Sequence, residues 1–583
     1  MTNEHVFAQI WSAIHNCDAN TAQQLLDSVQ EIYGNEPEFF YMKGMLALLN
    51  KDFALPFFEK AYDGLQNNKD FLLAYAQLLK DYKHYYSCLT VLGKLLNFDR
   101  ENITVLTEIA ALFDIMGNPI SAINVLTLIL KIKPNLDYIC QHMGNLLVGI
   151  GALDEAIEWY KKALDLNPEK ESSAHNICYT SNFIDMSREE NFALNQKYRM
   201  FWESENPAPR LPFPNTEKIK VGFVSGDFHL HSVSYYVRGI FSNYDKSKFE
   251  IHLFTNSTTF DHISREFQNY TDKWHDITKF TYSQIADLVK SEEISVLIDL
   301  SGHTGFNCLK AFGFRPAPLQ ISYCGYPNTT GLKSFDYRIS DNVCEPEDAQ
   351  NFHSEKLYKF DGCFLCYSPD TSVPDCGFED LQNCGIIFGS FNSITKYSDK
   401  TIRLWAKVVN SVPNAKLTIK HKFFNDPAFR ELILNRFAKL GLRAEKISIL
   451  GFFNMATFEH LQQYSKIDIA LDSFPYNGTT TTCEALFMGV PVITILGDRH
   501  CSRVSASILN AVGHPELVAK DEEEFVEIAK NLALNTGKLV EIKQNLREKM
   551  KKSMLCDQKL FTKKFENAIL DMINEIKAEE NKK

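Results

Sequence analysis

The spacing of apolar and polar positions changes near residue 219, and this change separates two kinds of structure. Before it, apolar residues recur at helical spacing in segments divided by short polar stretches. After it, short apolar runs alternate with helical patterns, as in parallel α/β sheets. The pattern therefore predicts an α-helical region followed by α/β domains.

The helical region carries a repeat of the tetratricopeptide type. In residues 136–168 small side chains such as Gly144 stand where two antiparallel helices would approach closely, and Pro168 closes the unit. Pro134 precedes Pro168 by 34 residues, the period of these repeats. We expect four or five helical hairpins over residues 1–185, stacked as a solenoid whose groove binds an acceptor protein or peptide.

Two series of strands follow these repeats. Residues 186–218, which are rich in proline, are expected to form a linker. Residues 219–375 and 385–545 then predict two Rossmann-like halves, and a terminal helix is expected over 555–578. Two such halves facing a cleft form the GT-B architecture of glycosyltransferases. The expected strands are Ile219–Ser225, Phe249–Thr255, Val296–Leu300, Leu319–Tyr323, Tyr337–Ser340 and Leu357–Phe360 in the first half, and Ile386–Ser390, Lys416–Lys420, Ile447–Leu450, Ile467–Asp472 and Val492–Leu496 in the second.

The segment from Ile467 to Ile495 carries the strongest chemical pattern. Its first apolar run ends at Asp472, and a turn and four consecutive threonines starting at Thr479 follow before a helical pattern begins. Free backbone N–H groups and the helix dipole attract phosphate at such a place, and hydroxyl groups add further donors. An ordinary strand-to-helix turn with threonine as N-cap has the same pattern.

Polar side chains also follow other expected strands. His231 comes after the first strand of the first half and His303 after its third, whereas Asn392 and Lys396 come after the first strand of the second half. His460 lies at a helix start after a later strand. Parallel α/β sheets bind ligands at the carboxyl ends of their strands. A lysine at a helix start beside exposed N–H groups suits a diphosphate.

Seven stretches in a fixed order carry a family resemblance. They are VGFVSGDFHLHSVSYY, DLSGHTG, RPAPLQISYCGYPNTTGL, FDYRISD, FDGCFLCYSP, FGSFNSITK and LDSFPYNGTTTTCEALFMGVPVIT. Through them, residues 190–535 resemble the catalytic region of the O-linked N-acetylglucosamine transferase family, glycosyltransferase family 41. The stretches look most like the SPINDLY branch, whose plant members are protein O-fucosyltransferases.

The resemblance implies a role for each candidate position. His231 matches an active-site histidine, as a base or a donor contact, and Lys396 matches the lysine on the donor diphosphate. His460 matches a histidine near the nucleotide base, and Glu484 an acid that contacts the ribose. The family's phosphate-binding loop matches Asn477, Gly478, Thr479, Thr480 and Thr481.

Three departures from the animal enzymes bear on the donor. Thr479 stands in place of a histidine, Glu484 in place of an aspartate, and Thr457 in place of a lysine near the base. All three changes look like the SPINDLY branch. The resemblance therefore leaves two donors, UDP-N-acetylglucosamine and GDP-fucose, of which we favour the first on the breadth of the family.

The implied reaction is an inverting displacement in which a Ser or Thr hydroxyl of an acceptor protein attacks the anomeric carbon. Lys396 and loop N–H groups would stabilise the leaving diphosphate without a metal ion or other cofactor. The proton acceptor is either His231 or a diphosphate oxygen. One Cys-x-x-C pair, Cys363 and Cys366, lies in an apolar run with only Cys376 and Cys384 downstream, so we expect no zinc site.

Composition narrows the choice of function. A net charge of −12 argues against a general nucleic-acid surface, and 14 scattered cysteines are typical of a reduced, cytoplasmic protein. We also expect no signal peptide and no membrane span. Two alternatives to a protein O-glycosyltransferase stay open, a GT-B enzyme acting on a non-protein acceptor and an inert scaffold.

Overall fold

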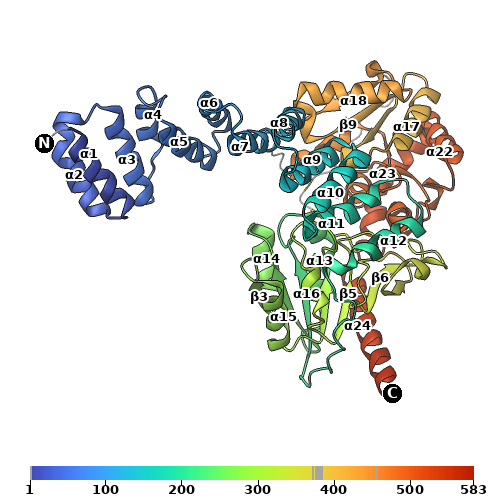
Figure 1. Ribbon diagram of the computed structural model, residues 1–583. Coiled ribbons are helices and arrows are strands. Elements are labelled where there is room, and N and C mark those ends of the chain that lie inside the picture. The colour runs from blue at the N-terminus through green and yellow to red at the C-terminus, as the bar shows by residue number, and fades with distance from the viewer. Residues whose placement is uncertain (1–2, 371–372, 374–384, 453–456, 583) are drawn as a thin grey trace. The chain divides into compact units, whose positions relative to one another are not determined.

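The computed structural model describes residues 3–370, 373, 385–452 and 457–582, and the chain divides after Ile139 into two compact units (Figure 1). The first unit is built from helical hairpins, in which each helix packs against the next. Its helices are α1 (Asn3–His15), α2 (Ala19–Tyr33), α3 (Pro37–Leu49), α4 (Leu55–Tyr62), α5 (Lys69–Asp81), α6 (Tyr85–Leu95), α7 (Ile103–Ile115) and α8 (Pro119–Ile132).

Small residues let the paired helices approach each other. A Cβ atom placed on Gly44 of α3 would lie 2.7 Å from the ring of Phe58 on α4, so that only glycine fits there. Phe58 is itself buried and stacks on Phe71 of the next hairpin, with 5.7 Å between ring centroids. The buried apolar residues of the first unit form two clusters, one over α1 to α3 and one from α3 to α7, and α3 contributes to both.

Most of the last hairpin, α9 (Asp137–Ile150) and α10 (Leu153–Leu166), lies in the second unit, which begins at Cys140 and holds both Rossmann-like halves. Gly144 receives the ring of Tyr160, as the repeat pattern requires, and α11 (Glu171–Thr180) follows. The hydroxyl of Thr395 donates to the carbonyl of Val148 at 3.2 Å, which ties α9 to the second Rossmann-like half. The expected boundary at residue 185 is therefore not where the compact units separate.

The expected linker over residues 186–218 begins with a helix instead. Helix α12 (Arg188–Tyr198) starts with a capping box, in which Ser187 and Glu190 satisfy each other's backbone N–H groups, and a 3₁₀ turn, η2 (Arg199–Phe201), ends it. Arg188 makes two hydrogen bonds to Asp348 of the first half, at 2.7 and 2.8 Å. Because these contacts hold the segment in place, only the proline-rich part after it is extended.

The first half contains a parallel sheet of seven strands within the described residues, in the order β3-β2-β1-β4-β5-β6-β7. Strands β2 and β3 are added on one side of β1, and strands β4 to β7 on its other side. Sheets of this kind bind ligands in the crevice at such a reversal, here between β1 and β4. The strands are β1 (Ile219–Ser225), β2 (Phe249–Thr255), β3 (Lys273–Asp276), β4 (Val296–Asp299), β5 (Leu319–Ser322), β6 (Tyr337–Asp341) and β7 (Lys356–Phe360). The helices are α13 (Ser232–Asn243), α14 (His262–Tyr270), α15 (Tyr282–Ser291) and α16 (Leu309–Gly313).

The second half has the same design. Six described strands form a parallel sheet in the order β10-β9-β8-β11-β12-β13, with the reversal between β8 and β11. The strands are β8 (Ile387–Ser390), β9 (Lys416–Lys420), β10 (Ile447–Leu450), β11 (Ile469–Leu471), β12 (Val492–Ile495) and β13 (Val518–Ala519). The helices are α17 (Asp399–Ser411), α18 (Pro427–Lys439), α19 (Thr457–Gln462), α20 (Thr480–Phe487), α21 (Val504–Val512), α22 (Glu522–Leu534) and α23 (Thr536–Lys551).

The terminal helix α24 (Gln558–Glu580) returns to the first half (Figure 1). Phe565 packs on Phe223 and Tyr323 of that half, and Tyr337 donates a hydrogen bond to Glu575 at 2.7 Å. Among the described helices, none combines the length and the apolar character that crossing a bilayer requires. The predicted tetratricopeptide repeats and the GT-B fold are confirmed.

Candidate functional site: a cleft between the two Rossmann-like halves

A cavity of about 430 Å³ lies where the two sheet reversals face each other. Both halves and helix α11, which follows the last repeat hairpin, contribute to its wall, so the site needs three segments that are far apart in the sequence. Its lining residues are Tyr179, Asp227, His231, Ser232, Val233, Tyr236, Thr304, Gly305, Phe306, Cys324, Gly325, Asn392, Ser393, Lys396, Tyr476, Thr479, Thr480 and Thr481.

His231 lies at the start of α13, on the first half's side of the cavity. Its Nδ1 accepts the backbone N–H of Val233 at 3.4 Å and lies 3.5 Å from a carboxylate oxygen of Asp227. Burial lowers the pKa of His231, and the field of Asp227 opposes this only in part. The imidazole is therefore neutral near pH 7 with its side chain 43 % exposed, which leaves Nε2 available to a ligand.

Lys396 lies across the cavity, in the short 3₁₀ turn η4 (Ile394–Lys396) before α17. Its ammonium donates to the carbonyl of Asn477 at 2.7 Å and lies 4.4 Å from the centre of the Tyr476 ring. Burial lowers the pKa of Lys396 to about 8, and Asp472 acts in the opposite direction. Lys396 thus supplies a cation beside the threonine loop in an environment that strengthens its field.

The threonine loop, residues 479–482, follows a turn that is held by hydrogen bonds to Asp472. Oδ1 of this buried carboxylate accepts the N–H of Gly478 at 2.7 Å, and Oδ2 accepts the hydroxyl of Thr494 at 2.7 Å. Helix α20 then begins at Thr480, after Thr479 as its N-cap residue. The first N–H groups of a helix have no intrahelical partners, so they are free to bind phosphate oxygens at this wall of the cavity.

The other candidates of the second half divide between the cavity and its surroundings. Asn392 lines the cavity and accepts the hydroxyl of Thr481 at 2.8 Å. Asn477 is fully buried and acts through its carbonyl on Lys396. His460 and Glu484 lie beside the cavity rather than in its wall, where Nε2 of His460 is 3.0 Å from Oε2 of Glu484.

His303 is not placed in the cavity, in contrast to the expectation from the sequence. It is buried against Trp202, and its Nδ1 lies 2.9 Å from Nδ1 of His175 on α11. Its Nε2 lies 3.0 Å from the carbonyl of Thr330. Burial lowers the pKa of His303 to about 4. Both nitrogens of this neutral ring are used within the protein, while its neighbour Thr304 lines the cavity.

Three tyrosines of the cavity wall were not assigned a role from the sequence. Tyr236 donates from the first half to the hydroxyl of Thr480 at 3.2 Å, directly across the cleft. Tyr476 stacks on Phe183, with centroids 4.5 Å apart, and Tyr179 reaches the cavity from α11. Tyr236 stands one helical turn after Ser232, so the helical spacing in the sequence places both on the same face of α13. Tyr179, by contrast, lies far from every motif in the sequence.

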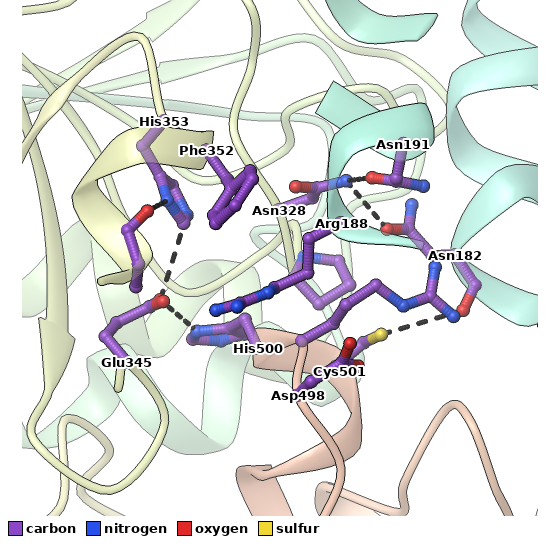
Figure 2. A pocket seen from close by; sticks show the side chains of 13 residues that line it. Asn182, Arg188, Asn191, Asn328, Glu345, Phe352, His353, Asp498, His500 and Cys501 are labelled. Carbon is purple, nitrogen blue, oxygen red and sulfur yellow. Dashed lines mark hydrogen bonds and ion pairs between the residues drawn. The ribbon is translucent and has the colours of Figure 1, made fainter. Parts of the chain in front are cut away.

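A second, smaller pocket lies where the helices after the repeats meet both halves (Figure 2). Nδ1 of His500 in the second half lies 2.6 Å from Oε1 of Glu345 in the first half, and Nε2 of His353 lies 3.9 Å from the same oxygen. Burial raises the pKa of Glu345, but His353, His500 and Arg338 outweigh it and bring the pKa to about 2. The pocket measures about 30 Å³, which is room for a water molecule but not for a substrate. We therefore assign the ion pair of Glu345 and His500 to the contact between the two halves.

Within the described ranges, one group of side chains has the spacing of a metal site, namely His252, His275 and Glu292. It lies at β2, β3 and the end of α15, and none of its members lines the cavity. Lys273 already pairs with Glu292 at 2.6 Å, which places a competing cation in the group. Cys363 and Cys366 are buried free thiols, whereas Cys376 and Cys384 lie outside the described residues.

Comparison with known proteins places this geometry in a family. The family model described as Glycosyl transferase family 41 matches residues 196–368 and 377–565. The chain belongs to glycosyl transferase family 41. A tetratricopeptide repeat model matches residues 138–170, and the resemblance noted in the sequence is thereby confirmed.

Curated relatives and a solved structure extend this family match. A probable UDP-N-acetylglucosamine–peptide N-acetylglucosaminyltransferase SPINDLY of Oryza sativa subsp. japonica is 35% identical over 434 residues, which cover 71% of this chain and 46% of that protein. The SPINDLY of Arabidopsis thaliana is 37% identical over 359 residues, or 61% of this chain and 39% of its own length. The chain thus spans about half the length of the curated relatives it matches, or less.

The structure of an O-GlcNAc transferase variant from Thermobaculum terrenum matches with a TM-score of 0.79 and 26% identity. The match covers 87% of this chain and 98% of that one, so it includes both the helical repeats and the two Rossmann-like halves.

Proposed function

We propose that this chain is a protein O-glycosyltransferase that transfers a sugar, most simply N-acetylglucosamine from UDP-N-acetylglucosamine, to Ser or Thr hydroxyl groups. One observation carries the proposal. A single cavity brings the cation of Lys396 and the N-terminus of α20 together with the neutral imidazole of His231. The names of the relatives, which describe peptide N-acetylglucosaminyltransferases, support the same class of reaction.

The chemistry follows from these groups. The acceptor oxygen forms a bond to the anomeric carbon as the bond from that carbon to the diphosphate oxygen breaks, which inverts the configuration. Negative charge grows on the leaving diphosphate, where Lys396 and the N–H groups of Thr480 and Thr481 stabilise it without a divalent cation. The hydroxyl proton passes to Nε2 of His231 or to a diphosphate oxygen.

Two donor sugars are compatible with the wall of the cavity beside the proposed diphosphate site. Thr479 lines the cavity with a small side chain, so the space beside the sugar phosphate admits either N-acetylglucosamine or fucose. GDP-fucose is therefore the second candidate donor, supported by the SPINDLY-like loop sequence. The acceptor protein would be bound through the helical repeats, which carry no phosphate-binding pattern of their own.

Transfer of the sugar to protein is tested directly by mass spectrometry of peptides. The purified chain is incubated with a proteome extract and either UDP-N-acetylglucosamine or GDP-fucose, and tryptic peptides are searched for one added sugar on Ser or Thr. The proposal predicts modified peptides with one of the donors, and about 10²–10³ times slower modification by the Lys396→Met variant. Sugar transfer to lipid or glycan fractions alone would instead support a GT-B enzyme with a non-protein acceptor.

A further inference from the structure

A buried lysine at the end of β9 has no part in the reaction described so far. Lys420 is 3 % exposed, and its ammonium lies 5.0 Å from the centre of the Phe391 ring and 5.2 Å from that of Phe452. A buried ammonium costs free energy unless it is paired, so a specific partner is expected. The ammonium forms a short hydrogen bond with Nδ1 of His460 on α19.

This bond fixes the proton on the histidine ring. An ammonium can only donate, so Nδ1 of His460 accepts and carries no proton. The proton of the neutral ring is then on Nε2, which faces Oε2 of Glu484 at 3.0 Å and donates to it. Lys420, His460 and Glu484 therefore form a directed chain of hydrogen bonds from a cation to a carboxylate.

The carboxylate of Glu484 ends this series of hydrogen bonds, and only one of its two oxygens receives hydrogen bonds from the part of the protein that the structure describes. Oε2 of Glu484 also accepts the hydroxyl of Tyr464 at 3.1 Å, so both of its donors come from the protein. Oε1 receives no hydrogen bond from any residue that the structure describes. Glu484 stands one helical turn, about 5.4 Å, after Thr480, on the helix whose N-terminus faces the proposed diphosphate site, so its carboxylate lies next to the place proposed for the donor phosphates.

We propose that Lys420 is a positioning residue for the donor nucleotide: through His460 it holds the Glu484 carboxylate so that Oε1 accepts a ribose hydroxyl. This inference rests on the proposed function, because it requires a nucleotide in the cleft. The groups that face Lys420 are His460, Glu484 and, from the end of η7 (Gln463–Lys466), Lys466. Glu484 provides the opposing charge that makes the buried cation tolerable.

The test compares nucleotides that differ by one hydroxyl group. Binding of UDP and GDP is measured by calorimetry beside their 2′-deoxy and 3′-deoxy analogues. A hydrogen bond to a charged group is worth about a 10- to 100-fold change in affinity. The wild-type chain should therefore bind the ribonucleotide more tightly than one of its two deoxy analogues by about that ratio. In Lys420→Met the ratio should fall to within about threefold, as in Glu484→Gln, while the deoxy nucleotide still binds.

Two controls separate the role of Lys420 from a general effect. Lys422→Met changes an exposed lysine two residues away and should keep the wild-type ratio. In a double-mutant cycle, Lys420→Met should add little to His460→Gln, because both changes break the same chain. Should the Met variant unfold, Lys420→Gln keeps a donor at this position, and the ratio should then stay nearer that of the wild-type chain.

Each outcome has a distinct meaning. A wild-type ratio in Lys420→Met would overturn the positioning role, and so would additive losses in the cycle, because they would show that Lys420 does not act through His460. Failure of the wild-type chain to bind UDP or GDP would contradict the proposed function itself. Binding of either nucleotide without any preference for the ribose hydroxyls would leave the proposed function standing and overturn only this inference.

Discussion

Replacement of Lys396 by methionine tests the diphosphate site most sharply. Methionine keeps much of the length and volume of the side chain but removes the ammonium that lies 2.7 Å from the carbonyl of Asn477. One group that stabilises developing charge is typically worth about 10²–10³ in rate, or about 2.7–4 kcal/mol. We expect kcat/KM for donor hydrolysis or transfer to fall by that factor.

The fold should survive the change. Loss of the ammonium leaves the Asn477 carbonyl without that donor, at a cost of about 1–3 kcal/mol, but it also removes a cation from a site where burial lowers its pKa to about 8. The two effects oppose each other, so the thermal midpoint should change little. Lys400→Met is a matched control on the first turn of α17, since Lys400 is 39% exposed and lies outside the cavity.

The assay is a continuous measurement of released nucleoside diphosphate at donor concentrations on both sides of KM. The Lys400 variant should behave as the wild-type chain does. Turnover of the Lys396 variant within about threefold of wild type, in a protein with an unchanged thermal midpoint, would refute the assignment of Lys396 to the diphosphate.

Three further predictions address pH, metal ions and the helical units. Because the protonated form of Lys396 binds the diphosphate and its pKa is about 8, kcat/KM for the donor should fall as pH rises above about 8, and this loss should be absent in Lys396→Met. Activity should persist in excess EDTA, and loss that manganese or magnesium restores would contradict the mechanism. Removal of residues 1–136 leaves the second unit with α9 whole, so donor hydrolysis should continue while labelling of proteins in an extract falls, and equal labelling by both forms would contradict the role of the repeats.

The sequence predicted the central strands well because their apolar runs are buried on both faces. Ile219–Ser225 and Lys416–Lys420 were expected with the bounds that the structure has. Strand β3 was missed because Lys273–Asp276 has polar residues and lies at the sheet edge, where one side lacks a partner strand. Strand β13 has only two residues, too few for a periodicity to show.

Helix α12 could have been found from the sequence. Ser187 and Glu190 have the spacing of a capping box just before the helix, but the prolines after residue 206 led to the prediction of a linker. His303 could not have been excluded in this way. Its position after a strand predicts the cleft, whereas its contact with His175 comes from a helix 128 residues earlier.

The sequence predicts which residues of the candidate site follow a strand end, but it predicts only partly where their side chains point. His231, Lys396 and the threonine loop follow strands at the two sheet reversals, and the topology alone brings them to one cleft. The bond between Lys420 and His460 joins two elements through side chains, so no spacing in the sequence signals it.

The most direct test of the account is a side-by-side titration of the purified chain with UDP-N-acetylglucosamine and GDP-fucose by calorimetry. The account predicts saturable one-to-one binding of one donor, competition by the matching nucleoside diphosphate, and a large loss of affinity in Lys396→Met. Preference for GDP-fucose would change the proposed sugar and keep the site. Absence of binding for both donors, in a folded protein, would contradict the central claim that this cleft is a nucleotide-sugar site.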